Sequence, residues 1–180
     1  METNALILLA TGRDRPGIVD QISGVIYKTG CNLEDSRMSV LGGEFALIVL
    51  VTGERDRLTR LAKDLGEEAR ALELTLQTKW TQPAPREDPS RPSIPYRLHV
   101  VSMDHPGIVH KITHLLSASG INVARLDTRV SHAPVSGTPV FSLELDAQVP
   151  ADLSVAKLRS DLGALAAAEN IDVDLRPAKE

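Results

Sequence analysis

The chain has 180 residues, of which 42% are hydrophobic and 24% charged, and its net charge is -4. These values fit one or two small globular domains with aliphatic cores, and the mild negative charge without a basic stripe argues against direct binding of nucleic acid. The single cysteine, Cys31, excludes an internal disulfide, and the lack of a signal peptide or a bilayer-length apolar run predicts a cytoplasmic protein with no membrane partner.

The first half predicts the order strand, helix, strand, strand, helix, strand. Leu6–Ala10 is a short apolar run typical of a buried strand, and a helix with apolar residues at helical spacing follows and ends at Gly30. Two strands, Asn32–Val40 and Phe45–Val51, flank a hairpin turn at Leu41-Gly42-Gly43. The apolar stripes are Ile18, Val19, Ile22, Val25 and Ile26 in the first helix, Leu58, Leu61, Leu65 and Ala69 in the second, and Leu72, Leu74 and Leu76 in the last strand.

Residues 82–95 contain five prolines, which regular elements exclude from their interiors. Proline-rich segments are extended and semi-rigid. We therefore predict an interdomain linker at 82–95, with one domain at 1–81 and another at 96–180.

The second half repeats the first at an offset of ninety residues. Nine of the 25 residues from Leu8 to Asn32 are identical to those from Leu98 to Asn122, which indicates a duplicated domain. The matching elements are strands at Leu98–Val101, Asn122–Val130 and Val140–Asp146, a helix of Ile108, Val109, Ile112, Leu115 and Leu116 that ends at Gly120, a helix of Val155, Leu158, Leu162 and Leu165 capped by Asp152 or Ser154, and a strand of Ile171, Val173 and Leu175.

The order β-α-β-β-α-β, found twice, predicts two tandem α+β domains of the ferredoxin-like class. Each helix has one apolar stripe, so both helices of a domain must cover the same face of an antiparallel sheet. The other face is then open to solvent or to a partner. Apolar residues on that open face would favour homodimers.

The turn between the first strand and first helix of each half is the most informative feature. Asp14 and Asp104 stand where a side chain would cap the helix, and Pro16 and Pro106 suit its first turn. Gly17 and Gly107 have no Cβ, and exposed amides at a helix start attract a carboxylate. With Asp14 and Asn32 holding an ammonium group, such a site would suit both ends of a free amino acid. The alternative is that these residues only cap the helix and shape the turn.

The motif Asp-x-Pro-Gly-Ile-Val, with Gly-x-Asn about thirteen residues later, resembles the ACT domain. Two such domains in so short a chain resemble the glycine cleavage system transcriptional repressor group. The resemblance implies an amino-acid site at domain interfaces, formed by Asp14, Arg15, Pro16, Gly17, Ile18 and Asn32 in one half and Asp104, His105, Pro106, Gly107, Ile108 and Asn122 in the other. It also implies action through a transcription factor rather than on DNA.

The two halves differ in two places. Arg15 of the first turn becomes His105 in the second, so the two sites are expected to differ in charge. The segment His132–Thr138 has no counterpart in the first half; it either covers a site, contacts a partner or is a tolerated insertion, as long hairpins often are.

Other chemistry finds little support. His110 and His114 have the spacing of metal ligands on a helix, but they should face solvent and no third ligand is evident, so we expect no metal. Cys31 has no histidine in its half to act as a base, which argues against covalent catalysis. No phosphate-binding glycine loop is present, and no cofactor is expected.

The sequence therefore predicts a non-enzymatic regulatory protein, and a homo-oligomer, that binds a small amino acid, with glycine or serine suggested by the resemblance, and controls a protein partner. The alternatives are a regulatory subunit of an amino-acid biosynthetic enzyme and an interaction module without a ligand.

Overall fold

The computed structural model describes residues 4–82, 92–134 and 136–178. The chain divides into two compact units, Met1–Pro85 and Arg86–Glu180. Unit 1 contains β1 (Asn4–Arg13), α1 (Ile18–Lys28), β2 (Asn32–Leu41), β3 (Glu44–Gly53), α2 (Arg55–Ala71) and β4 (Thr75–Thr81). Unit 2 contains β5 (Ser93–Met103), α3 (Ile108–Ala118), β6 (Asn122–His132), β7 (Pro139–Pro150), α4 (Val155–Glu169) and β8 (Asp172–Pro177).

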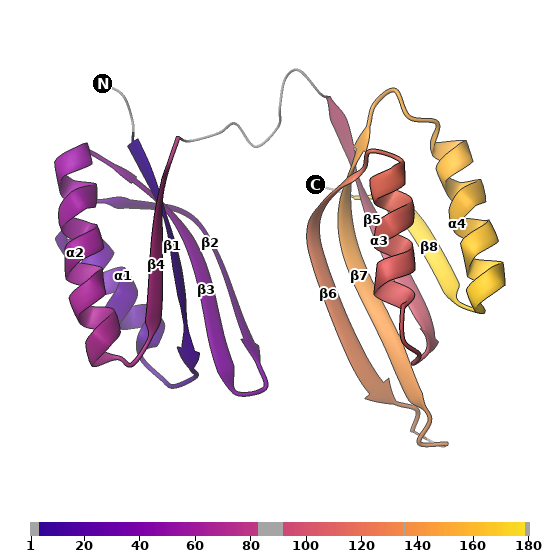
Figure 1. The fold of residues 1–180 in the computed structure, drawn as a ribbon, viewed down its shortest axis with the longest axis horizontal. Coiled ribbons are helices and arrows are strands. Elements are labelled where there is room, and N and C mark those ends of the chain that lie inside the picture. The colour runs from indigo at the N-terminus through magenta and orange to yellow at the C-terminus, as the bar shows by residue number, and fades with distance from the viewer. Residues whose placement is uncertain (1–3, 83–91, 135, 179–180) are drawn as a thin grey trace. The chain divides into compact units, whose positions relative to one another are not determined.

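Each unit has one four-stranded antiparallel sheet, in the order β2-β3-β1-β4 in unit 1 and β6-β7-β5-β8 in unit 2. In each unit both helices lie against the same face of the sheet (Figure 1). The prediction of two ferredoxin-like α+β domains is confirmed.

The cores consist mainly of aliphatic side chains from the helix-covered faces, with Phe45 in the core of unit 1 and Phe141 in that of unit 2. In unit 1 the predicted stripe of α2 is buried in full, and Leu6, Leu8 and Ala10 of β1 pack under it with alternate residues of β3. In unit 2 only Leu158 and Leu162 of the α4 stripe are fully buried, because α4 is richer in alanine and reaches the sheet through fewer large side chains. A fully buried leucine stabilises a fold by about 2 kcal/mol, so unit 1 draws more of its stability from its second helix.

Glycines have positive φ angles at the predicted hairpin turn and at the predicted ends of the first helices. Gly42 and Gly43 both have positive φ, 61° and 84°, as a two-residue hairpin turn requires. Gly30 and Gly120, with φ of 68° and 69°, follow the first helix of each unit. The first edge strands also share a bulge, which falls between Leu33 and Asp35 in β2 and between Val123 and Arg125 in β6.

The predicted linker differs from the structure at its end. Residues 83–91 lie outside the described part of the chain, whereas Ser93, Ile94 and Pro95 begin β5. The sheet tolerates Pro95 at this position. Pro95 pairs with Gln148 of β7, and its carbonyl accepts a hydrogen bond from the amide of Ala178, just past the end of β8. The ring nitrogen of Pro95 points to the same side as its carbonyl, toward Ala178 and away from β7, so the ladder between β5 and β7 loses no hydrogen bond.

Among the described residues, none of the helices has both the length and the apolar character needed to cross a membrane.

Candidate functional site

The loop between β1 and α1 is a type II turn, and so is the loop between β5 and α3. Gly17 has φ 94° and ψ -11°, and Gly107 has φ 98° and ψ -7°, each directly after a proline. These angles are those of the third residue of a type II turn, where glycine is favoured, with proline favoured just before it. A Cβ on Gly17 would meet only Gln21 Nε2, at 3.5 Å, so the backbone angle rather than crowding requires glycine there.

The predicted caps are wrong. Each helix has its glycine, Gly17 or Gly107, at the N-cap position, and no side chain caps either helix. Asp14 and Asp104 stand three residues earlier, where their amides donate to the hairpin carbonyls of Gly43 and Pro139. Pro16 and Pro106 precede the helix instead of opening it, because the type II turn takes them as its second residue. In α4, by contrast, Ser154 accepts a hydrogen bond from the amide of Lys157, as one of the two predicted caps.

The uncapped starts of α1 and α3 differ in charge. The first N–H groups of a helix have no partner within it, and they carry partial positive charge. The first turn of α1 contains Asp20, whereas the matching residue of α3 is His110 and the first turn of α3 has no acid. An anion would therefore meet less repulsion at α3 than at α1.

Arg15 and His105 have different partners. Arg15 Nη2 donates to the carbonyl of Leu72, the residue that caps the C-terminus of α2, at 2.6 Å. The ring of His105 comes near only its neighbour, with Nδ1 3.3 Å from the carbonyl of Pro106. In unit 2 the two helices are joined instead by Lys111 Nζ, 2.5 Å from Oε2 of Glu169. Arg15 is thus bonded within unit 1, whereas the half-buried His105 makes no hydrogen bond to another element among the described residues.

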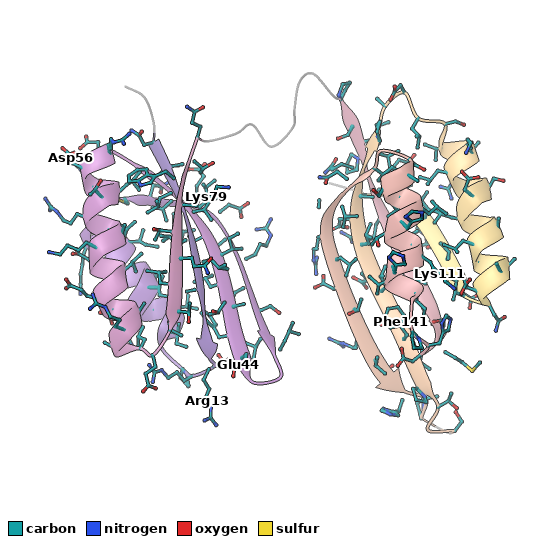
Figure 2. The ribbon with its side chains drawn as sticks, viewed as in Figure 1. Arg13, Glu44, Asp56, Lys79, Lys111 and Phe141 are labelled. Atoms are coloured by element: carbon teal, nitrogen blue, oxygen red, sulfur yellow. The ribbon has the colours of Figure 1, made fainter. Side chains whose placement is uncertain are left out.

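The two candidate regions of each unit lie at opposite ends of its sheet. Arg13, next to Asp14, pairs with Glu44 at one end, whereas Asn32 pairs with Thr52 near the other. Figure 2 labels Arg13 and Glu44 at the loop end of unit 1 and Asp56, in the first turn of α2, at the far end. Ten-residue strands place the ends about 30 Å apart.

The prediction that Asp14 and Asn32 of one half hold the same ammonium group is therefore wrong. Asn32 Nδ2 instead donates to Glu34 Oε2, 3.1 Å away. Asn122 lies at the corresponding end of unit 2, where it pairs with Gln148. The side chains of Ile18 and Ile108 are buried in the two cores, so these residues offer a ligand only their backbone.

A hollow of about 510 Å³ lies at the loop end of unit 1, and no sequence motif indicated it. It is lined by Thr11, Gly12, Ser39, Leu41, Glu44, Phe45, Ala46, Glu73 and Thr75, while the loop residues 14–18 are not among its lining. Its polar groups come from separate strands and from the end of α2. Only the strand register brings them together, so no local sequence pattern indicates the hollow.

The matching positions of unit 2 carry different charges. Where unit 1 has Ser39, Glu44 and Glu73, unit 2 has Arg129, Val140 and Asn170. Glu73 and Asn170 share a positive φ, 55° and 54°, which confirms that they are equivalent. The two carboxylates are therefore particular to unit 1.

The remaining candidates show no reactive arrangement. The rings of His110 and His114 are 5.9 Å apart on the exposed side of α3, and within the described ranges no three metal-binding side chains come together. Cys31 is half-buried and packs against the core of unit 1.

Comparison with known proteins agrees with this architecture. ACT-domain models match residues 4–79 and residues 96–163. The glycine cleavage system transcriptional repressor of Escherichia coli (strain K12) is 32% identical over 160 residues, which are 89% of this chain and 83% of that protein.

Two crystal structures resemble the whole chain. One is of an unknown protein from Galdieria sulphuraria, with a TM-score of 0.82, 28% identity, and coverage of 99% of this chain and 100% of the other. The second, provisionally described as a glycine cleavage system transcriptional repressor, has a TM-score of 0.76 and 26% identity over 99% of each chain. The chain therefore belongs to the ACT-domain family, and it is a tandem member homologous to the glycine cleavage system transcriptional repressors.

Proposed function

We propose that this ACT-domain regulatory protein binds a small amino acid at the loops 14–18 and 104–108 and thereby controls a protein partner, a transcriptional regulator of amino-acid metabolism. The observation that carries the proposal is the repeated loop: both copies have the same type II turn before an uncapped helix, within a chain homologous over most of its length to a repressor of the glycine cleavage system. Glycine and serine are the first ligands to test.

The chemistry of the loop suits an amino acid. The amides at the start of α1 and α3 have no partner within their helix and would donate hydrogen bonds to a carboxylate, and the exposed carboxylates of Asp14 and Asp104 would attract an ammonium group. Glycine at the N-cap leaves room for such a ligand, because a Cβ there would meet little.

Unit 2 is expected to bind more tightly. The start of α3 has His110 where α1 has Asp20, and His105 makes no bond to another element, whereas Arg15 is held by Leu72. Asn32 and Asn122 lie about 30 Å from the loops of their own units, so one amino acid contacts both regions only where two domains meet.

The homologue is a transcriptional repressor, which supports a regulatory role for this chain. Because the chain has a net charge of -4, we expect it to act through a protein partner rather than by direct contact with the negatively charged DNA backbone. Ligand binding would shift an equilibrium between two arrangements, provided the ligand prefers one of them.

The test is a thermal-shift screen of the full chain against the twenty amino acids. A ligand that binds the folded state stabilises it by about 2.7 kcal/mol at a concentration of 100 Kd, which raises Tm measurably. We expect a rise with glycine or serine, a larger loss of that rise in Asp104→Ala than in Asp14→Ala, and a further loss when Asn32 and Asn122 are changed to Ala.

The matched control is Asp152→Ala, an exposed acid just before α4 that lies outside both loops. It should leave the response unchanged. No shift with any amino acid at millimolar concentration would instead favour an interaction module without a ligand.

A further inference from the structure

The open faces of the two sheets have opposite character at their four central positions. In unit 1 these positions are Ile7 and Leu9 of β1, paired with Leu50 and Ile48 of β3. In unit 2 the same register positions are Arg97 and His99 of β5, paired with Asp146 and Glu144 of β7. The four apolar residues of unit 1 are here called the apolar patch.

The apolar patch faces away from the helices. Its members alternate with Leu6, Leu8, Val49 and Val51, which are buried beneath α1 and α2. Ile48 is 45% exposed, and Ile7, Leu9 and Leu50 are half-buried. Contiguous apolar surface of this kind on a sheet commonly marks an interaction site.

In unit 2 the same face is polar. Arg97 Nε donates to Asp146 Oδ1 at 2.8 Å, and this bond raises the pKa of Arg97 above its ordinary value. A pair of arginine and aspartate replaces the pair of Ile7 and Leu50, so the apolar residues of unit 1 are not a requirement of the fold.

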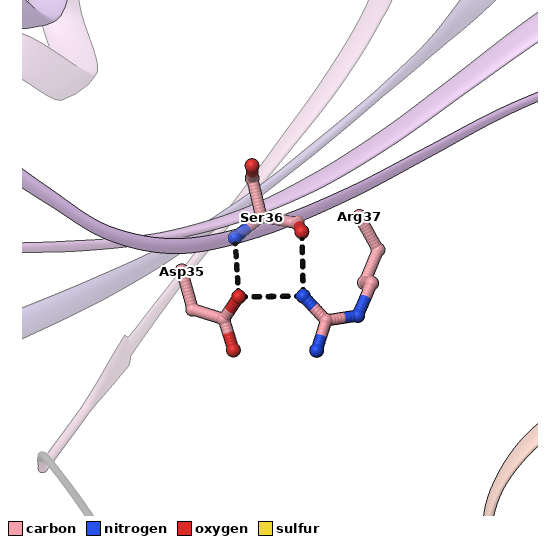
Figure 3. Close-up of polar contacts among 3 residues, drawn as sticks. All are labelled: Asp35, Ser36 and Arg37. Atoms are coloured by element: carbon pink, nitrogen blue, oxygen red, sulfur yellow. Dashed lines mark hydrogen bonds and ion pairs between the residues drawn. The ribbon is translucent and has the colours of Figure 1, made fainter. Parts of the chain in front are cut away.

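Opposite charges flank the apolar patch at the two edges of the sheet. In one row of the sheet, Asp35 of β2 lies at one end and Lys79 of β4 at the other, with Leu50 and Ile7 between them. Figure 2 labels Lys79 on β4, and no ion pair of Lys79 is found among the described residues. Asp35 accepts from Arg37 Nη1 at 2.6 Å and from the amide of Ser36 at 2.8 Å (Figure 3).

We propose that the apolar patch is the interface of a homodimer, in which the open faces of two copies of unit 1 stack about a two-fold axis parallel to the strands. This rotation exchanges the two edges of the sheet, so β2 of one copy lies over β4 of the other. Asp35 then faces Lys79 of the second copy, Arg37 faces Gln77, and Ile7 and Leu9 face Leu50 and Ile48. The patch packs on itself, and Lys79 of each copy lies opposite an acid of the other copy.

The size of the face is adequate. Three strands of ten residues and one of seven, about 4.8 Å apart, cover roughly 600 Å² before side-chain relief is counted, close to the roughly 800 Å² per partner of a standard interface. Closed two-fold pairing through one self-complementary surface is the commonest form of homo-oligomer, and aligned sheets stack in this way within β-sandwiches. The rows beyond the patch end in small polar residues, Ser39 and Thr75 at one end and Asn32 and Thr81 at the other, which form a polar rim.

The test measures the dissociation constant of the full chain by sedimentation equilibrium from micromolar to millimolar concentration. The wild-type chain should be a dimer. Ile48→Glu introduces the residue that unit 2 carries at the same position, Glu144, so the sheet tolerates it, and it should raise the dissociation constant by at least about 100-fold because it buries a charge. Glu144→Gln is the matched control in unit 2 and should leave the constant unchanged. Circular dichroism confirms that each variant is folded.

A charge reversal tests the axis. Lys79→Asp should weaken the dimer by about tenfold, and combining it with Asp35→Lys should restore most of the loss. A wild-type monomer at every concentration, or a dimer indifferent to Ile48→Glu, would overturn the interface. A dimer that responds to Ile48→Glu but not to Lys79→Asp would overturn the two-fold arrangement. All of these measurements are made without an amino acid, so their outcome is distinct from that of the ligand screen.

Discussion

The two units agree wherever the backbone needs a particular residue and differ where side chains meet solvent. Both have the type II turn before the first helix, the positive-φ glycine after it, and a bulge at the same point of the first edge strand. By contrast, the edge-strand ion pair is reversed in order, with Asp35 and Arg37 in β2 and Arg125 and Asp127 in β6. The comparison separates residues that build the ACT fold from residues that give each copy its surface.

This separation changes the meaning of the Asp-x-Pro-Gly motif. The turn geometry alone accounts for the proline and glycine in both copies, so the proposal of a ligand rests on the uncapped helix that follows each turn and on the homology. The differences around the turn, Arg15 against His105 and Asp20 against His110, are where a functional distinction between the units would reside.

The largest expected effect is at Gly12, which unit 2 replaces with Ser102. A Cβ at Gly12 would lie 2.6 Å from Leu74 Cδ2 and 3.3 Å from the carbonyl oxygen of Glu73. Leu74 is buried, so we expect Gly12→Ser to destabilise unit 1 by about 3 kcal/mol through overpacking. Urea unfolding followed by the fluorescence of Trp80, the only tryptophan of the chain, reports on unit 1.

Ser102→Ala is the reciprocal change in unit 2. The Ser102 hydroxyl is buried and finds no hydrogen-bond partner among the described residues, so its removal should stabilise unit 2 by about 1 kcal/mol. Hydrogen exchange of β5 and β7 measures this change. If Gly12→Ser leaves the stability of unit 1 unchanged, the ends of β1 and β5 pack alike and the explanation by overpacking is wrong.

A smaller effect, and one shared by both units, is expected at the turn glycines. Gly17→Ala and Gly107→Ala should each cost about 1–2 kcal/mol, because a residue with a Cβ is strained at φ 94° or 98°. Gly24→Ala, in the middle of α1 with open space around it, is the control and should stabilise by about 0.5–1 kcal/mol. Stabilisation by Gly17→Ala would contradict the assigned turn.

The smallest effect separates the units again. Arg15→Ala should destabilise unit 1 by about 1 kcal/mol, because it removes the hydrogen bond to the Leu72 carbonyl, whereas His105→Ala should change unit 2 by less than about 0.5 kcal/mol. The same fluorescence and exchange measurements apply. A matching loss at His105 would show that this ring also supports the end of α4.

The internal repeat made most of the fold predictable. The aliphatic stripes placed all four helices, and the Gly42-Gly43 pair placed the first hairpin, since these patterns depend only on neighbours along the chain. The N-caps of α1 and α3 lie three residues after the predicted ones, at Gly17 and Gly107 instead of Asp14 and Asp104. An aspartate before a helix fits both a cap and a preceding turn, so the sequence does not distinguish the two. Pro95 was assigned to a linker, although a proline whose missing amide faces the end of a strand is compatible with a sheet.

The candidate site was less predictable for a physical reason. The sequence by itself determined two β-α-β-β-α-β domains, their cores and their repeated turn, because these follow from periodicity and from backbone preferences of single residues. Only the tertiary structure decided that Asn32 lies at the opposite end of the sheet from Asp14, and that Ile7, Leu9, Ile48 and Leu50 form one exposed patch. Strand register joins residues distant in sequence, and it depends on long-range hydrogen bonding and packing that no local pattern specifies.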